Sequence, residues 1–242
     1  MIGWKAKIGV LVPSCNYIIE PEMYKMVSQN SGITVHFARM FLTEDSEEEI
    51  KALPKHAKEA SILLMHAAVD IIGFGCTAGS FVGGLDYDKK IINDIESITN
   101  IPVTTTSTAL LEAMKVAGAK KISIVTPYQD WINEKEKAFL EQNGIKVLKI
   151  VGMNLGRKGQ VPEIGDIFPE ATYELCIKNF VPGSDALFIS CTGFRTIEII
   201  RDLEEDLKTV VITSNQATLW HMLKKLNIST KSLECWGQLM RR

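Results

Sequence analysis

The sequence predicts an α/β protein with parallel sheets, and three observations support that class. Short runs rich in β-branched residues recur along the chain, a helix-like stretch follows most of them, and the two halves of the chain share a pattern. Strands that alternate with helices favour a parallel sheet with helices on its faces. The expected strands are residues 7–13, 32–40, 69–75, 101–107, 120–127, 145–153, 185–190 and 209–214.

The helix after the second expected strand has a recognisable start. Ser46 and Glu49 have the spacing of a capping box, and acidic residues fill the first turn, where they interact favourably with the helix dipole. Pro54 falls inside the helical pattern, so we expect a kink or a break there.

An internal repeat divides the expected strands into two sets of four. The stretch IGVLVPSCN begins at Ile8, and ISIVTPYQD begins at Ile122, 114 residues later. GCTAG and SCTGF place Cys76 opposite Cys191 at an offset of 115, GITVHF and GIKVLK match at an offset of 112, and a weaker match lies near 107. Such repetition indicates a duplicated four-stranded α/β unit. We expect a first domain over residues 1–110, a second over 111–215, and a C-terminal segment, 216–242, that packs back on the first.

Composition and charge exclude several functional classes. The chain has 242 residues, of which 46% are hydrophobic and 23% charged, as is typical of a globular protein. A net charge of -2 gives no general electrostatic reason to expect nucleic acid or an anionic membrane as a partner. The N-terminal apolar run ends early, at Pro13, and no run approaches the roughly 18 apolar residues of a membrane span. We therefore expect a cytoplasmic protein.

The cysteines do not form a recognisable framework. Five of them, an odd number, are spread through the chain without CxxC pairs and without nearby histidines at metal-ligand spacing. This pattern argues against both a disulfide framework and a zinc site. Each thiol is therefore interpreted from its surroundings, and Cys176, on an expected helix, is interpreted as a core residue.

Two cysteines occupy matching turns at the carboxyl ends of expected strands. Ligands of open parallel sheets bind at those ends, so two facing domains would bring Cys76 and Cys191 to one ligand from opposite sides. Each cysteine precedes a threonine and a small residue, a turn whose backbone N–H groups can bind carboxylate or phosphate oxygens. A thiolate is both a nucleophile and an acid–base catalyst. Burial in the core is the ordinary fate of a single cysteine, but the matched pair favours a functional interpretation.

Asn16 and Tyr128 flank the same expected cleft. Asn16 offers an amide after the first strand and Tyr128 a phenol at the matched turn, although singly each is as well explained as a turn residue or a partly buried aromatic. The glycines of residues 73–79 match a dinucleotide-binding loop weakly, because they follow the third strand and the acid at the required distance, Glu96, lies in an expected helix.

Five motifs together resemble a known enzyme family. VPSCNYIIEPEMY, GFGCTAGSF, IVTPYQDWINEKEKAFLEQNGIKV, SCTGFRT and SNQATLW, in this order, are similar to the maleate isomerase and arylmalonate decarboxylase branch of the aspartate/glutamate racemase superfamily. The resemblance covers nearly the whole chain. It implies two Rossmann-like (flavodoxin-like) domains related by a pseudo-two-fold axis, an active site between them, and cofactor-independent chemistry on small dicarboxylates or related carbon acids.

The resemblance also implies roles for individual residues. Cys76 resembles the nucleophile that adds to the double bond of a cis-enedioate, and Cys191 resembles the cysteine that exchanges a proton with the intermediate. Decarboxylases of this branch keep the second cysteine and typically have glycine in place of the first, so the presence of both thiols favours an isomerase or a racemase. The predicted substrate-binding residues are Ser14, Asn16, Thr77, Ala78, Tyr128, Thr192 and Gly193.

One segment departs from the family pattern. Maleate isomerases usually supply another asparagine shortly before an EIGR segment, whereas this chain reads GRKGQVPEIGDIFPE. Val161 and Pro162 stand where that amide is expected, and Asp166 replaces a common arginine. We expect this loop to be adapted to a particular substrate.

Three functions follow as hypotheses. The first is an isomerase or racemase of a small carboxylate or dicarboxylate, most like maleate cis-trans isomerase, with Cys76 as nucleophile and Cys191 as acid–base catalyst. The second is an arylmalonate-type decarboxylase in which Cys191 is the proton donor, and the third is a non-catalytic protein that binds small anions. We expect no cofactor and no metal, and the family resemblance makes a homodimer or homotetramer a reasonable expectation.

Overall fold

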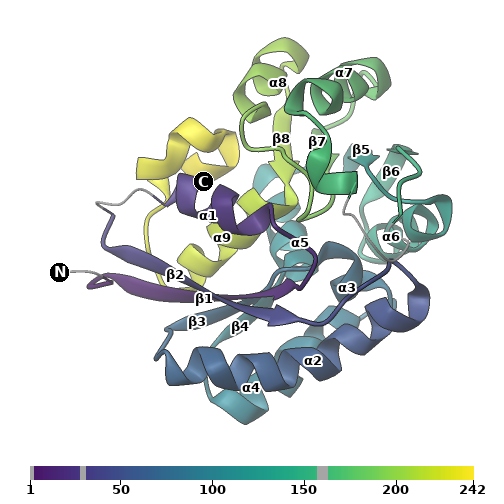
Figure 1. The fold of residues 1–242 in the computed structure, drawn as a ribbon. Coiled ribbons are helices and arrows are strands. Elements are labelled where there is room, and N and C mark those ends of the chain that lie inside the picture. The colour runs from purple at the N-terminus through teal and green to yellow at the C-terminus, as the bar shows by residue number, and fades with distance from the viewer. Residues whose placement is uncertain (1–2, 28–30, 157–162) are drawn as a thin grey trace.

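The structure, a computed structural model, describes residues 3–27, 31–156 and 163–242. Two four-stranded sheets lie in the two halves of the chain (Figure 1). Their spatial orders are β2-β1-β3-β4 and β6-β5-β7-β8, and every pair of neighbouring strands is parallel. The predicted fold class is therefore confirmed, and the matching strand orders are those of a duplicated unit.

The first sheet comes from the first half of the chain, and its helices come from that half and from α9 (Ser214–Lys225), near the C-terminal end. The helices α2 and α4 cover one face of this sheet, and α1 and α9 cover the other (Figure 1). In chain order the elements are β1 (Ala6–Pro13), α1 (Ile19–Met26), β2 (Ile33–Met40), α2 (Glu47–His66), β3 (Ile71–Phe74), α3 (Thr77–Phe81), α4 (Tyr87–Thr99) and β4 (Val103–Thr105).

The second half repeats this order and ends in short 3-10 turns. Its elements are α5 (Thr106–Ala117), β5 (Lys121–Thr126), α6 (Asp130–Gln142), β6 (Lys146–Gly152), the 3-10 helix η1 (Glu163–Asp166), α7 (Pro169–Asn179), β7 (Ala186–Ile189), α8 (Ile200–Leu207), β8 (Val210–Thr213), α9 (Ser214–Lys225), η2 (Lys231–Trp236) and η3 (Gln238–Arg241).

The predicted strands are all present, and their bounds differ from the prediction by two residues at most. Central strands are covered on both faces, which is why they read as continuous apolar runs rather than as alternating patterns. In β1, for example, Ile8, Val10 and Leu11 have no exposed surface. Of the kink or break expected at Pro54, the break is wrong, because α2 continues through Pro54 to His66. The start of α2 does have the predicted cap, since the Ser46 side chain accepts a hydrogen bond from the Glu49 N–H.

The helices α5 and α9 pack against each other between the two sheets. Thr218 on α9 donates a hydrogen bond to the hydroxyl of Thr106 on α5, at 3.1 Å. The end of the chain also contacts the first half, since Lys225 Nζ lies 2.8 Å from the Val103 carbonyl oxygen. The expected boundary at residue 110 lies inside α5, and the division into domains stays a prediction.

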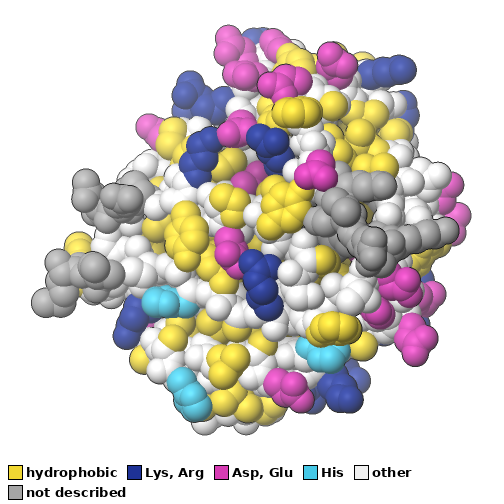
Figure 2. Space-filling view, in the orientation of Figure 1, with side chains coloured by type: hydrophobic (Ala, Val, Ile, Leu, Met, Phe, Trp, Pro, Cys, Tyr) yellow, Lys and Arg dark blue, Asp and Glu magenta, His cyan; other side chains and the backbone are white. Residues whose placement is uncertain are grey.

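The surface carries charges of both signs. On the face shown in Figure 2, Lys and Arg side chains are interspersed with Asp and Glu, and acidic side chains gather over α7 and α8. In the part of the chain that the structure describes, no helix combines the length and the apolar character needed to cross a bilayer.

Candidate active site

The two matching cysteines lie at the carboxyl ends of the third strand of each sheet. Cys76 follows β3 and caps the short helix α3, where its Sγ accepts a hydrogen bond from the Gly79 N–H at 3.4 Å. Cys191 follows β7, and its Sγ accepts from the Gly193 N–H at 3.3 Å. Both side chains are nearly buried, with 7% and 8% of their surface exposed. Each thiol is therefore held by the backbone of its own turn.

The glycines before Cys76 serve close packing. A Cβ on Gly73 would lie 2.7 Å from the sulfur of Met222 on α9, and a Cβ on Gly75 would lie 2.9 Å from the Leu11 carbonyl oxygen. Both distances are too short for a real contact. A larger residue at Gly73 would displace the Met222 side chain, and one at Gly75 would push the thiol turn away from the backbone of β1. These glycines bring strand, helix and thiol turn together.

Both thiols open into one small cavity of about 30 Å³. Of the predicted site residues, the cavity is lined by Asn16, Cys76, Thr77, Ala78, Tyr128, Cys191, Thr192 and Gly193. Ser14 does not line it, because its hydroxyl both donates to and accepts from the backbone of Leu42, at 3.1 and 3.0 Å. The structure thus brings together residues from both halves of the chain.

Sequence reasoning missed a second part of the lining. Pro13, Leu42, Asp45, Ile50 and Ile164 also border the cavity. Leu42 and Asp45 follow β2, so the rule that ligands bind beyond the carboxyl ends of parallel strands contained the necessary signal. No lysine or arginine is among the described lining residues. Amide, hydroxyl and backbone groups therefore supply the polar contacts that these residues can offer an anion.

Hydrogen bonds between the two halves fix the relative position of the thiol turns. The hydroxyl of Thr77 donates to the Ser214 hydroxyl at 2.9 Å, and the backbone N–H of Cys191 donates to the same oxygen at 3.0 Å. In the opposite direction, the Thr192 hydroxyl donates to the Gly75 carbonyl at 3.2 Å. Each Cys–Thr turn is thereby joined to the other half of the chain.

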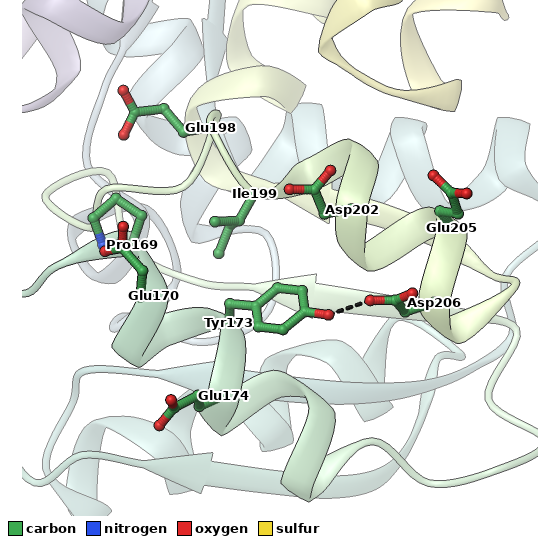
Figure 3. A pocket seen from close by; sticks show the side chains of 9 residues that line it. All are labelled: Pro169, Glu170, Tyr173, Glu174, Glu198, Ile199, Asp202, Glu205 and Asp206. Carbon is green, nitrogen blue, oxygen red and sulfur yellow. Dashed lines mark hydrogen bonds between the residues drawn. The ribbon is translucent and has the colours of Figure 1, made fainter.

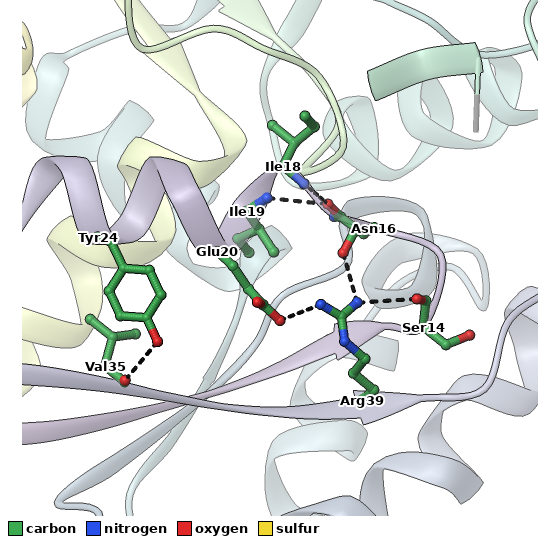
Figure 4. Close-up of polar contacts among 8 residues, drawn as sticks. All are labelled: Ser14, Asn16, Ile18, Ile19, Glu20, Tyr24, Val35 and Arg39. Atoms are coloured by element: carbon green, nitrogen blue, oxygen red, sulfur yellow. Dashed lines mark hydrogen bonds and ion pairs between the residues drawn. The ribbon is translucent and has the colours of Figure 1, made fainter. Parts of the chain in front are cut away.

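Asn16 is held on three sides. Its Oδ1 caps α1 by accepting from the N–H groups of Ile18 and Ile19, and its Nδ2 donates to the Thr192 hydroxyl at 3.1 Å. Arg39, which also forms an ion pair with Glu20, donates to the backbone carbonyl of Asn16 at 2.9 Å (Figure 4). The second Nδ2 hydrogen is the part of this amide that a ligand could use.

Tyr128 faces the thiols as a neutral phenol. Burial raises the pKa of Tyr128 well above its usual value, and Coulombic interactions with Cys191, Glu136 and Cys76 in their ionised forms raise it further. The phenol also donates a hydrogen bond to Cys191. Tyr128 therefore keeps its proton throughout the physiological range and acts at the cavity as a hydrogen-bond donor.

Two buried glutamates stand behind the site, and neither was predicted. Burial raises the pKa of Glu136 to about 8, although a 2.6 Å hydrogen bond from the Ser190 hydroxyl lowers it in part. Burial also raises the pKa of Glu22 to about 7, against the effect of three N–H donors. Their positions differ by 114 residues, the offset of the repeat around Ile8 and Ile122, so the sequence contained a signal for the pair.

A larger cavity lies away from the thiols, between α7 and α8 (Figure 3). Its volume is about 790 Å³, and acidic side chains dominate its lining. Tyr173 donates a hydrogen bond to Asp206 across it. Its described lining residues include no cysteine, histidine or cation, so the small cavity between the thiol turns is the better candidate for chemistry.

Neither Cys176 nor His221 is part of the cavity between the thiol turns. Cys176 is buried in α7, and burial raises its pKa to about 12, so this thiol stays protonated. His221 contacts the Thr104 hydroxyl at 2.8 Å, and burial lowers its pKa to about 4. No group of three or more histidine, cysteine or acidic side chains able to hold a metal ion occurs among the residues that the structure describes.

The fold and the cavity define a class of protein, a duplicated α/β protein in which two cysteines from matching turns line one small cavity. The described lining of that cavity includes the carboxylate of Asp45 and no lysine or arginine. The comparison with protein families agrees with this class. The arylmalonate decarboxylase family (Amdase) matches residues 8–240, and the chain belongs to that family.

Individual relatives include both enzymes of the predicted branch. The chain is 25% identical to the maleate isomerase of Geobacillus stearothermophilus, with 93% of each chain covered. It is also 25% identical to the arylmalonate decarboxylase of Bordetella bronchiseptica, with 96% of this chain and 95% of that protein covered. A solved structure of Nocardia farcinica maleate cis-trans isomerase with a covalently bound succinylcysteine intermediate has a similar fold, with a TM-score of 0.91, 21% identity and 98% of both chains covered. The predicted family resemblance is confirmed.

The backbone at Cys191 leads to a first prediction. Its φ of 106° lies in a region that residues with a Cβ rarely adopt, at a typical cost of about 1–3 kcal/mol. Cys191→Gly should therefore be more stable than Cys191→Ala by about 1 kcal/mol, although both remove the thiol. Urea denaturation of the two variants measures the difference. In the matched pair Cys176→Gly and Cys176→Ala, inside α7, the glycine should be the less stable variant by about 1 kcal/mol. The same order at both positions would contradict the prediction.

The burial of Glu136 leads to a second prediction, about pH. Because the pKa is about 8 in the folded protein and ordinarily 4.5, the stabilisation that Glu136 contributes is complete below pH 4.5 and is lost as the pH rises through 8. When the pH is raised from about 5 to about 8.5, the free energy of unfolding should fall less in Glu136→Gln than in the wild type. The difference should be a few kcal/mol, because each unit of pKa difference between the folded and unfolded states corresponds to about 1.4 kcal/mol. Urea denaturation at both pH values tests this.

Glu141→Gln is the matched control for that measurement, because Glu141 lies on the same helix and is exposed. This variant should follow the wild type at both pH values. Parallel losses of stability in Glu136→Gln and the wild type would show that Glu136 does not titrate in this range.

Proposed function

We propose that the chain is a cofactor-independent cis-trans isomerase of a small cis-enedioate of the maleate type. The observation that carries the proposal is the presence of two thiols, Cys76 and Cys191, on one small cavity. A decarboxylase of this branch typically has glycine at the first position, so the Cys76 thiol is what distinguishes the two activities. Relatives named maleate isomerase, among them those of Geobacillus stearothermophilus and Pseudomonas putida, support the same choice.

In this proposal Cys76 adds to the substrate. Its thiolate forms a C–S bond to one carbon of the double bond, and the π electron pair moves toward the carboxylate on the other carbon. Cys191 gives its S–H proton to that second carbon, which leaves a succinyl group attached to Cys76. The succinylcysteine named for the Nocardia farcinica enzyme is an adduct of this kind.

Isomerisation follows from the loss of the double bond. The central C–C bond is single in the adduct, so the two carboxylates can rotate to the trans arrangement. The Cys191 thiolate then removes a proton from the second carbon, the electron pair re-forms the double bond, and the C–S bond breaks to regenerate the Cys76 thiolate. Every proton and electron pair is returned, so the cycle needs no cofactor.

The remaining lining residues would bind the carboxylates. In this proposal the donors are the second Nδ2 hydrogen of Asn16, the Tyr128 phenol and the hydroxyl and backbone groups of Thr77 and Thr192, all of them residues that line the cavity. Val161 and Pro162, which stand where the family has an asparagine, lie outside the described residues, but Ile164 from the same segment borders the cavity. In this proposal that segment selects the substrate. A small dicarboxylate as partner, a homodimer or homotetramer, and a cytoplasmic location are further parts of the proposal.

A decarboxylase is the second candidate, and one observation favours it. Leu42, Ile50 and Ile164 form an apolar side of the cavity. Such a side would destabilise a carboxylate that leaves as carbon dioxide, because a charge loses solvation there. The C–C bond would break to give an enediolate, and Cys191 would protonate it. Cys76 would then have no essential role.

One experiment separates these functions. Proton NMR follows maleate, aspartate, glutamate and phenylmalonate in D2O with the wild type, Cys76→Ala and Cys191→Ala. We expect the wild type to convert maleate to fumarate, and both variants to lose at least about a hundredfold in rate. Cys76→Ala lacks the nucleophile, and Cys191→Ala lacks the group that gives and removes the proton.

The other outcomes have distinct meanings. Decarboxylation that survives Cys76→Ala but not Cys191→Ala would replace the isomerase with the decarboxylase. Loss of α-deuteration of an amino acid in both variants would identify a racemase. If the wild type converts none of a broader panel of acids but binds them, the protein is a non-catalytic binder of small anions.

A further inference from the structure

Glu22 connects the first half of the chain to the loop that follows Cys191. It lies on α1 and is buried, and its Oε1 accepts from the backbone N–H groups of Thr196 at 2.7 Å and Ile197 at 3.2 Å. Its Oε2 accepts from the Asn215 side-chain amide at 2.7 Å. All three donors belong to the second half of the chain or to α9, so this one side chain spans the junction behind the cavity.

Asn215 extends this contact to the thiol turn. Its Nδ2 donates to Glu22 and also to the Thr192 carbonyl oxygen at 3.1 Å, so both amide hydrogens are used. Its Oδ1 is buried and has no hydrogen-bond partner among the described residues. A rotated amide would break both bonds, so Glu22 fixes the orientation in which Asn215 can hold Thr192.

The turn that carries Cys191 needs hydrogen bonds from its neighbours to keep its conformation. Thr192 and Gly193 line the cavity, and Cys191 has a φ of 106°. Backbone in this region persists only where the surroundings over-determine it. Ser214 holds the N–H of Cys191 on one side, and Asn215, oriented by Glu22, holds the Thr192 carbonyl on the other.

A carboxylate is the group suited to this position. It presents two acceptor oxygens and no donor, which matches three converging N–H groups, whereas an amide would direct its own N–H at one of them. Glu204 shows the same use of a buried glutamate away from the cavity, where it accepts from the N–H groups of Val211 and Gln238. Glu204 therefore provides a structural comparison that has no connection to the thiols.

We infer that Glu22 is a positioning residue for Cys191: acting through Asn215 and the loop at Thr196, it fixes the turn that aims the proton-exchanging thiol into the cavity. The effect of Glu22 on catalysis rests on the proposed function, in which Cys191 gives and removes the proton. The repeat supports a specific role, because Glu136, the equivalent residue on α6, bonds to Ser190 and leaves its Oε2 without a partner in the described structure.

The test compares Glu22→Gln with Glu204→Gln at about pH 8, above the pKa of about 7 of Glu22, so that the wild type carries the carboxylate. We expect Glu22→Gln to lower kcat for the maleate reaction 10- to 100-fold with KM changed less than about threefold, because a misplaced reacting group costs rate more than binding. Glu204→Gln should leave both constants near the wild-type values.

A second readout does not depend on the proposed function. The rate of iodoacetamide alkylation is measured separately at Cys76 and Cys191 by mass spectrometry. Glu22→Gln should change the Cys191 rate at least about threefold while the Cys76 rate stays constant. This change would support the inference even if the wild type proved not to convert maleate. Unchanged alkylation and unchanged kcat in a folded Glu22→Gln variant would overturn it.

A double variant separates positioning from stability. In Glu22→Gln with Asn215→Asp, the new amide can donate to the new carboxylate, so the bond between the two side chains is restored in reverse. Asp at 215 cannot donate to the Thr192 carbonyl. We expect the urea midpoint to recover while kcat stays low, and recovery of both would show a merely structural role. If Glu22→Gln fails to fold, Asn215→Ala removes the same link to Thr192 and takes its place in both assays.

Discussion

The hydroxyl of Ser214 is the point on which the candidate site depends. It accepts one hydrogen bond from the Thr77 hydroxyl and another from the backbone N–H of Cys191, so one buried oxygen joins the turns that carry the two thiols. Ser214 begins α9, directly after β8, and its position is therefore set by the second sheet and by the packing of α9 on the first. The separation of the thiols follows from the fold rather than from any flexible loop.

Much of this arrangement could be predicted from the sequence. The strands and their parallel pairing follow from local composition, and the duplication follows from the nearly constant offset between equivalent segments, which is typical of a repeated structural unit. The place of the Cys76 and Cys191 turns at the site could also be predicted, because the carboxyl ends of parallel strands lie at one edge of a sheet. Asn16 and Tyr128 stand in the turns that follow β1 and β5, so their position near the site could be predicted in the same way.

The rest depends on contacts between distant segments. Glu22 bonds to residues more than 170 positions away. Its spacing from Ile19 and Met23 places it on the buried face of α1, but its partners cannot be inferred from that helix alone. Pro54 shows the opposite error, because the local rule allowed a break in the helix and α2 continues through Pro54 to His66. Ser14 stands two residues before Asn16 in the sequence, but its hydroxyl bonds to the backbone of Leu42 and does not line the cavity. Side-chain direction in loops is decided by such tertiary bonds.

The two halves are equivalent in topology but not in detail, and the differences fall on the thiols. Cys76 caps a helix with a φ of -143°, a conformation open to any residue, whereas Cys191 sits in a turn with a φ of 106° that neighbours must enforce. Behind them, Glu22 is satisfied by donors from the opposite half, whereas Glu136 bonds only within its own half through Ser190. A symmetric pair of thiols would suit a reaction with equivalent proton transfers on two faces. A nucleophile and a proton carrier have different geometric needs, and the unequal support of Cys76 and Cys191 fits the division into those two roles that we propose.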